Sequence, residues 1–358
     1  MKEEKKILYL EVLRIVALLA IVFNHTSIDG FFLFTQEELF SMNSWIYCFF
    51  SIGCKFGVYV FFMISGALLL GKDESLETVL KKRVLKYVVI FIVWEAINYC
   101  YLCLTGSCEF GIIYFFKILY SYDLSFNFSY WFLVSYICFL MALPILRAIV
   151  RRIDKKTYIY VFVIFAVFEI ANFLPLISSF PYRNPNINID WLSPIYIIYP
   201  LLGYYLHTRI EDLNVKKLVI MIVFSVLSII MCSYFTMMNM TITGNLEEWN
   251  DNQLFHTSFV LLQSSTIFLL VKKVISNMNI TEVIYKIITT CSSLVFGIYL
   301  LHLPVIKSNL FAKVLSFFKN GLSINCMLSC WITCLIIILI LGLLTWFLKK
   351  IPYINKLI

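Results

Sequence analysis

A glutamate, an arginine and a histidine lie at helical spacing near the start of the chain. Glu11 and Arg14 are three residues apart, and His25 follows in an otherwise apolar run. At about 100° per residue the three side chains share one helix face, with Arg14 and His25 roughly 16 Å apart along the axis. An imidazole that titrates near neutral pH can act as a general base, and a guanidinium can bind an anion. The structural alternative is an ion pair between Glu11 and Arg14 and a histidine at the lipid–water boundary.

The second candidate site is a basic cluster near two small residues. Lys81, Lys82 and Arg83 precede an apolar run, and Ser65 and Gly66 lie near the end of the run before it. Lysine and arginine are natural partners of phosphate groups, so the cluster is a candidate site for a polyanionic ligand. Its alternative role is to anchor the chain at an anionic membrane surface. Ser65 and Gly66 predict either a close helix contact or room for a thin ligand arm.

Further polar side chains occur inside apolar runs, where they need a partner or a wet cavity. The candidates are Lys55, Glu95, Glu169, Tyr299 and His302. A charged group at the centre of a bilayer costs about 2.5–3.5 kcal/mol on insertion scales, so it usually faces a polar interior and serves a site. The alternative for His302 is a place at the membrane interface.

The composition is that of a polytopic membrane protein. Of 358 residues 61% are hydrophobic and only 14% are charged, whereas soluble domains carry roughly 25% charged residues. The net charge of +8 then reflects the loops and not nucleic-acid binding. Most of the eleven cysteines stand singly in apolar runs and are expected to be buried. None has metal-ligand spacing, so no metal is expected. Cys103 and Cys108 flank one span and would be able to pair at an oxidising face.

Ten apolar runs approach the roughly 20 residues that cross a bilayer. They cover 8–28, 45–70, 87–104, 130–149, 157–178, 192–208, 217–237, 254–272, 288–306 and 324–348. With the N-terminus inside the cell, the cytoplasmic loops carry 22 Lys and Arg residues and the outer loops carry 5. The sequence therefore predicts an all-α bundle of about ten membrane-spanning helices with both termini in the cytoplasm. It predicts a single membrane domain, 1–358, with no appended soluble domain, and 110–120 as an additional interfacial helix.

Together these motifs resemble the membrane acyltransferase-3 family. The resemblance rests on Glu11, Arg14 and His25, on Phe61–Gly66, on Lys81–Arg83, on Trp131–Pro144 and on Gly297–His302. The motifs follow the family's order over nearly the whole chain, and Trp131 joins the site candidates through its motif. One departure is Tyr59, where relatives often carry a proline before the Phe-Phe pair.

The resemblance implies a multi-pass O-acyltransferase of the plasma membrane. Such an enzyme takes an acyl group, most commonly acetyl, from cytoplasmic acyl-coenzyme A. It places this group on a hydroxyl of a cell-envelope glycan, such as a capsular or exopolysaccharide, a wall polymer or a lipid-linked sugar. A separate extracytoplasmic transferase is an expected partner if the acyl group is handed on.

The resemblance also implies roles for the candidate residues. The coenzyme phosphates would rest on the Lys81–Arg83 cluster and on Arg14, and the pantetheine arm would pass Ser65. His25 would be the general base, and Glu11 would hold the geometry of the helix. The leading alternative is a ten-span polysaccharide exporter or solute transporter. Transporters often carry Gly- or Pro-broken spans in matching halves, and no such symmetry occurs in this sequence.

Overall fold

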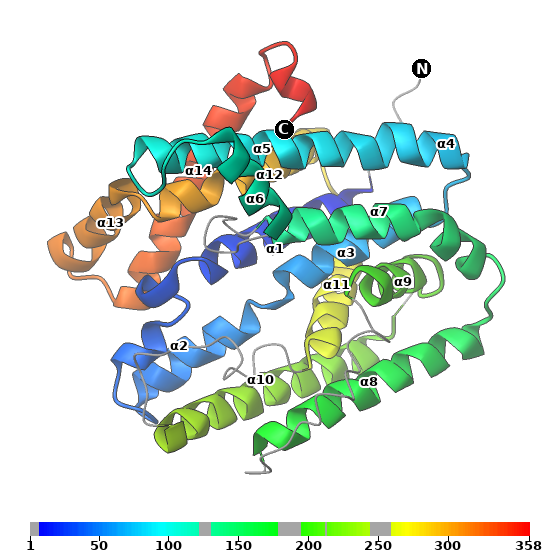
Figure 1. Ribbon diagram of the computed structural model, residues 1–358. Coiled ribbons are helices and arrows are strands. Elements are labelled where there is room, and N and C mark those ends of the chain that lie inside the picture. The colour runs from blue at the N-terminus through cyan, green and yellow to red at the C-terminus, as the bar shows by residue number, and fades with distance from the viewer. Residues whose placement is uncertain (1–6, 122–129, 178–194, 212, 244–258) are drawn as a thin grey trace.

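The computed structural model describes residues 7–121, 130–177, 195–211, 213–243 and 259–358. Within these ranges every regular element is a helix, which confirms the predicted all-α class (Figure 1). The helices are α1 (Leu8–Asn24), α2 (Met42–Gly53), α3 (Phe56–Leu69), α4 (Leu76–Thr78), α5 (Leu85–Leu104), α6 (Ile112–Ser121), α7 (Trp131–Val150), α8 (Lys155–Ile177), α9 (Ile195–Thr208), α10 (Val215–Thr243), α11 (Val260–Ser276), α12 (Glu282–Ile306), α13 (Asn309–Ser316) and α14 (Cys326–Leu348).

Six helical stretches of the described chain are long and apolar enough to cross a membrane. They are Met42–Leu69, Leu76–Leu104, Trp131–Val150, Val215–Thr241, Glu282–Ile306 and Cys326–Leu348. All ten predicted runs overlap helices, but some of these helices, such as α1 with 17 residues, are shorter than the roughly 20 residues of a typical crossing. The count of ten spans and the location of both termini stay predictions.

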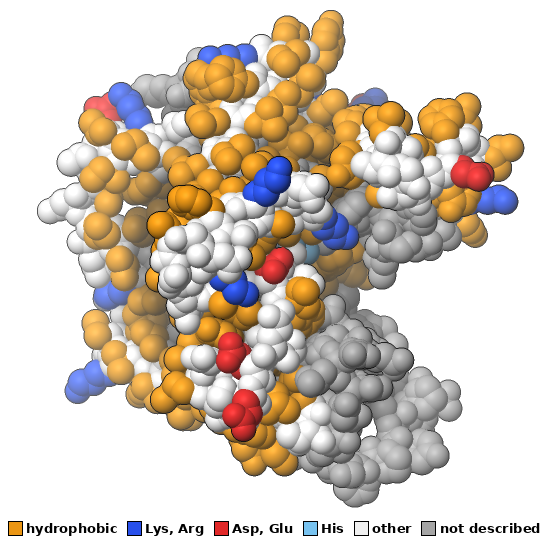
Figure 2. Space-filling view, turned by 90° about the vertical axis from the view of Figure 1, so that its left-hand side faces the viewer, with side chains coloured by type: hydrophobic (Ala, Val, Ile, Leu, Met, Phe, Trp, Pro, Cys, Tyr) orange, Lys and Arg blue, Asp and Glu red, His pale blue; other side chains and the backbone are white. Residues whose placement is uncertain are grey.

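The surface suits an apolar surrounding. Figure 2 shows hydrophobic side chains over much of one face, with only scattered charged groups. Many large apolar side chains of the described residues are exposed, including Leu339, Leu343 and Phe347 on α14. Contiguous exposed apolar surface of this extent is unusual for a soluble monomer and is expected for a protein that faces lipid.

Helix α1 is the centre of the bundle. It packs against α3, α11, α12 and α14, and ten of its 17 residues are buried. Side chains on the different faces of α1 can therefore contact four other helices.

The predicted run 45–70 is interrupted in its middle. Helix α2 ends at Gly53 and α3 begins at Phe56, with Cys54 and Lys55 between them. The Asn24 side chain donates a hydrogen bond to the Cys54 carbonyl at 3.1 Å. A break needs such partners because it frees backbone groups in an apolar surrounding. The break thus lies beside the residue that precedes His25.

Two glycines bring α3 and α9 into backbone contact. A Cβ on Gly66 would overlap the backbone of Pro200, and a Cβ on Gly203 would overlap the backbone of Met63. Close approach of this kind is the usual reason for small residues between membrane helices. The sequence predicts two roles for Ser65 and Gly66, a close helix contact and room for a ligand arm. Gly66 has the first of these, close helix packing.

Candidate active site

A cavity of about 230 Å³ lies between α1, α3, α5, α7 and α12. Arg14 and Ser65, two of the residues predicted to bind the coenzyme, line it together with Tyr299. The remaining lining residues are Ile21, Phe61, Ile64, Tyr87, Phe132, Tyr136, Ser292, Ser293, Val295 and Phe296. The cavity lining therefore contains a cation, several hydroxyl groups and apolar side chains. This combination suits a long ligand with a polar head.

The ion pair predicted at the start of α1 is present. Arg14 Nη1 donates to both carboxylate oxygens of Glu11 at 3.0 Å. The Glu11 side chain is 5% exposed, whereas that of Arg14 is 29% exposed. Glu11 thus orients the guanidinium from the buried side, and the rest of Arg14 faces the cavity.

Two tyrosines close the cavity on the side of α5 and α7. The rings of Tyr87 and Tyr136 meet edge to face, with centroids 4.8 Å apart. Both hydroxyls interact electrostatically with Arg14 and with Arg83, and the Tyr136 hydroxyl also interacts with Ser65. Two of the predicted cationic residues therefore lie within electrostatic reach of this tyrosine pair.

The two candidate histidines contact each other close to Ile21 and Tyr299, which line the cavity. His302 Nε2 lies 3.2 Å from His25 Nδ1, and the ring centroids are 4.9 Å apart. Each histidine is bonded to the carbonyl of a cavity-lining residue about one turn earlier in the chain. His25 Nδ1 lies 2.8 Å from the Ile21 oxygen, and His302 Nδ1 lies 2.5 Å from the Tyr299 oxygen.

These contacts assign the protons of both neutral rings. A carbonyl oxygen only accepts hydrogen bonds, so Nδ1 of each ring carries the proton and Nε2 carries the lone pair. His302 Nε2 is then an acceptor facing the N–H of His25. When His25 takes up a proton at Nε2, this contact stabilises the resulting imidazolium. The arrangement suits His25 as a base and His302 as the residue that positions it.

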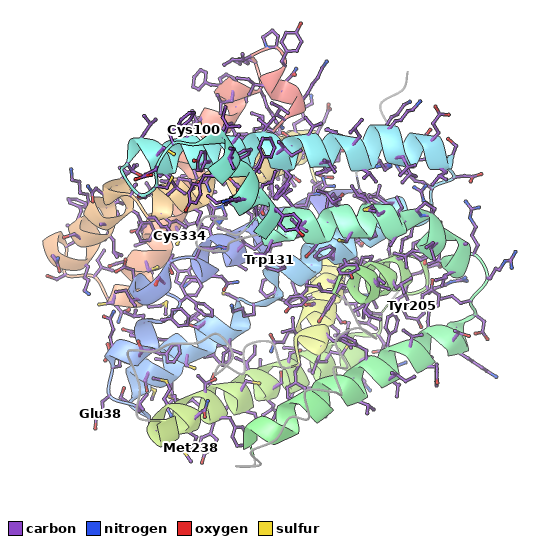
Figure 3. All side chains as sticks on the ribbon, viewed as in Figure 1. Glu38, Cys100, Trp131, Tyr205, Met238 and Cys334 are labelled. Atoms are coloured by element: carbon purple, nitrogen blue, oxygen red, sulfur yellow. The ribbon has the colours of Figure 1, made fainter. Side chains whose placement is uncertain are left out.

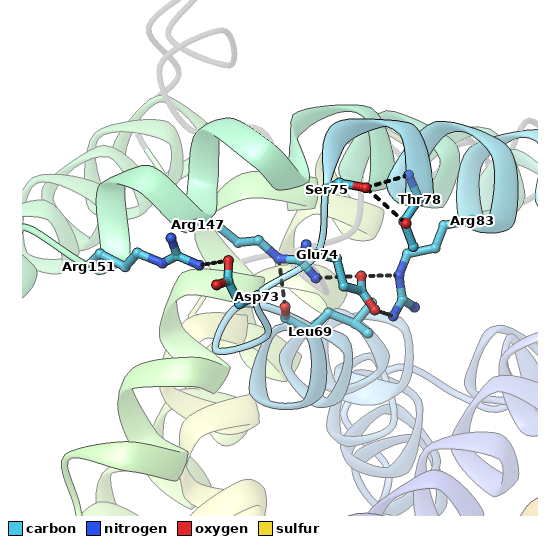
Figure 4. Close-up of polar contacts among 8 residues, drawn as sticks. All are labelled: Leu69, Asp73, Glu74, Ser75, Thr78, Arg83, Arg147 and Arg151. Atoms are coloured by element: carbon cyan, nitrogen blue, oxygen red, sulfur yellow. Dashed lines mark hydrogen bonds and ion pairs between the residues drawn. The ribbon is translucent and has the colours of Figure 1, made fainter.

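The basic cluster lies outside the cavity lining, and two of its members already bind carboxylates. Lys81 pairs with Glu77 at 2.7 Å with both side chains 72% exposed, and Lys82 is exposed. Arg83 donates from Nε and Nη2 to the two oxygens of Glu74 at 2.8 and 2.5 Å (Figure 4).

The other candidates inside apolar runs differ in their surroundings. Lys55 Nζ lies 4.4 Å from the ring centroid of Phe31 and interacts electrostatically with His25. Glu95 is 4% exposed on α5 and interacts electrostatically with Tyr130. Neither lines the cavity, although Lys55 lies on the histidine side of the site.

Of the last two candidates, Trp131 does not line the cavity and the Glu169 side chain is not described. Trp131, labelled in Figure 3, is the first residue of α7 and is 37% exposed, whereas the next residue, Phe132, lines the cavity. Glu169 belongs to α8, but its side chain lies outside the described residues.

Sequence reasoning missed several polar residues of the cavity. Tyr87, Tyr136, Ser292 and Ser293 line it. The Ser292 hydroxyl is buried with no hydrogen-bond partner in the described structure. The available signal was a polar side chain inside a predicted span, but tyrosines and serines are common there and no spacing singles these out.

Comparison with known proteins gives one match. The family model described as "Acyltransferase domain" matches residues 7–349. No curated protein and no solved structure matches the chain. Because the family model covers nearly the whole sequence, the chain belongs to this acyltransferase family, as its motifs predict.

Proposed function

We propose that this member of the acyltransferase-3 family moves an acyl group from cytoplasmic acyl-coenzyme A to a hydroxyl of a glycan on the outer side of the plasma membrane. Acetyl is the expected acyl group. The observation that carries the proposal is the cavity between Arg14 and the two histidines. Its lining reaches Ile21 and Tyr299, whose carbonyls bind His25 and His302.

The donor enters from the predicted cytoplasmic end. Its phosphates bind Arg14 and the basic cluster Lys81–Arg83, since guanidinium and ammonium groups pair with phosphate oxygens. The uncharged pantetheine arm then lies in the cavity along Ser65 and the aromatic lining. This places the thioester near the histidines at the far end.

The transfer itself needs one base and no further reactant. The acceptor hydroxyl oxygen attacks the thioester carbonyl carbon while His25 Nε2 takes up the hydroxyl proton. A C–O bond forms, the C–S bond breaks, and the proton passes from His25 to the leaving thiolate. The products are the glycan ester and free coenzyme A.

Two neighbours of His25 take part in this scheme, one through His25 and one through the thioester. His302 accepts the hydrogen bond from Nδ1 and stabilises the protonated ring. Lys55, which interacts electrostatically with His25, adds positive charge where the thioester oxygen becomes negative.

Label transfer tests the proposal. Inverted membrane vesicles that contain the protein and its natural envelope glycans are supplied with acetyl-coenzyme A carrying a radioactive acetyl group. The wild type should move label into the glycan fraction, and His25→Ala should not. His207→Ala is the control, because His207 is a half-buried histidine on α9 that bonds Tyr9 and does not line the cavity. Unchanged labelling in His25→Ala would refute the role of His25.

A further inference from the structure

A carboxylate bridges two arginines beside the cavity. Glu74 lies in the short connection between α3 and α4, and its two oxygens accept hydrogen bonds from Arg83 and Arg147 (Figure 4). Arg147 on α7 also donates from Nε to the Leu69 carbonyl at 3.0 Å. Hydrogen bonds from Arg83 and Arg147 lower the pKa of Glu74 to about 2. The carboxylate is therefore ionised, and the three side chains together carry one net positive charge.

Arg147 retains an unused donor within this group. Its side chain is 5% exposed, and its Nη1 is buried with no hydrogen-bond partner in the described structure. Leaving a buried charged donor without an acceptor is costly. A carboxylate offers two oxygens to the two guanidinium groups, whereas a phosphate offers three or four in a tetrahedral arrangement. A phosphate in the place of Glu74 would satisfy the remaining donor.

The group is close to the donor's expected path. Arg83 interacts electrostatically with Tyr87 and Tyr136, which line the cavity. Val79–Val84, which carries Arg83, is a π-helical turn, and such turns inside α-helices frequently mark functional sites. Arg83 thus connects the Glu74 group on one side with the cavity on the other.

We propose that Arg83 and Arg147 form a phosphate-binding site that the Glu74 carboxylate occupies in the absence of ligand. The phosphate belongs to a nucleotide-type donor or to a lipid headgroup, since both offer the same chemistry. Binding displaces Glu74, which is 20% exposed and stands on a connection of only six residues, 70–75. Glu74 therefore competes with the ligand and lowers its affinity. In its nucleotide form the inference rests on the proposed function, because it supplies the site for the donor's phosphates.

The test compares Glu74→Gln with a matched neighbour. Asp73 pairs at 2.8 Å with Arg151, which directly follows α7, and both of these side chains are exposed. Binding of coenzyme A, pantetheine and inorganic pyrophosphate to purified protein in phosphatidylcholine nanodiscs is measured by calorimetry. Glu74→Gln should bind coenzyme A and pyrophosphate about 3- to 10-fold more tightly than the wild type. Asp73→Asn should match the wild type, and pantetheine, which lacks phosphate, should not distinguish the variants.

Arg147 is tested separately. Arg147→Lys keeps the charge but loses the fork of donors, so its affinity for coenzyme A should fall about tenfold, with Arg151→Lys unchanged. Thermal unfolding of each variant confirms that it is folded. If Arg147→Lys does not fold, the Glu74→Gln comparison decides alone.

The outcomes separate the two proposals and the two phosphate sources. Suppose the wild type binds coenzyme A and Glu74→Gln binds each phosphate probe with the same affinity as the wild type. The phosphate site is then refuted and the proposed function stands. If no variant binds coenzyme A but Glu74→Gln gains affinity for pyrophosphate, the site is supported and the donor assignment fails. A second set of nanodiscs containing phosphatidylglycerol tests the lipid source. Loss of the Glu74→Gln gain for coenzyme A in these discs shows that the headgroup occupies the site.

Discussion

His302 Nε2 lies 3.2 Å from His25 Nδ1, although the two residues are 277 positions apart in the chain. His25 directly follows α1 and His302 lies on α12, and these two helices pack against each other at the centre of the bundle. His302 is 1% exposed and is fixed by its bond to the Tyr299 carbonyl. The contact therefore gives His25 a defined orientation as well as an acceptor for its N–H.

The first prediction separates the roles of the two histidines. His25→Ala should lower the rate of acyl transfer by about 10²–10⁴-fold, because general base catalysis contributes this much. His302→Gln, which keeps an acceptor toward His25, should retain more activity than His302→Leu. Steady-state kinetics provide the check, since a positioning residue should change kcat and leave KM for the acyl donor nearly constant. Equal kcat values for His302→Gln and His302→Leu would contradict this role.

The second prediction concerns two adjacent residues with different tasks. Gly66→Ala should lower the unfolding temperature, because its Cβ would overlap the backbone of Pro200 and overpacking costs about 1–3 kcal/mol or more. Ser65→Leu should fold normally and raise KM for the acyl donor, since Ser65 lines the cavity. Thermal unfolding in detergent and donor kinetics distinguish the two effects.

The control for Gly66 is another helical glycine. A Cβ on Gly342 would lie 3.8 Å from Ile298 Cδ1, which is an ordinary contact. Gly342→Ala should therefore be neutral or slightly stabilising, because alanine favours helix more than glycine does. A similar loss of stability in Gly342→Ala and Gly66→Ala would show that close packing of α3 and α9 is not the cause.

The third prediction compares two ion pairs at helical spacing. Glu11→Gln removes the charged acceptor of Arg14 at a position where the Glu11 side chain is buried, and should cost about 1.5–3 kcal/mol of stability. Glu77→Gln breaks the exposed pair with Lys81 and should cost about 0.5 kcal/mol or less. Chemical unfolding of both variants measures the difference. Equal costs would mean that burial of Glu11 does not strengthen its pair.

Local patterns and tertiary contacts were not equally accessible from the sequence. The helical period alone predicts that Glu11 lies next to Arg14, and the small size of Ser65 and Gly66 predicts a close helix contact or a path for a ligand. The sequence does not say that Gly66 makes the close contact and Ser65 lines the cavity, because this depends on the direction of each side chain around α3 and on the position of α9. The contact between His25 and His302 depends on helix packing, and the ion pair between Arg83 and Glu74 depends on loop conformation. Neither can be predicted from the spacing of residues in the sequence.

The fourth prediction follows from the ionisation of Glu74. Hydrogen bonds from Arg83 and Arg147 lower its pKa to about 2 in the folded protein, against roughly 4.3 in an unfolded chain. A carboxyl group whose pKa is lower in the folded state adds stability that is complete above the unfolded pKa and disappears as the pH falls through the folded pKa. The contribution of Glu74 to the free energy of unfolding should therefore be full above about pH 5 and should fade between about pH 4.3 and pH 2.

Glu74→Gln should unfold at a lower temperature than the wild type at pH 7, and the difference should shrink as the pH falls toward 3. Asp73→Asn, which affects an exposed pair, should show a smaller difference at pH 7. A constant difference between the wild type and Glu74→Gln from pH 7 to pH 3 would mean that the charge of Glu74 does not support the fold.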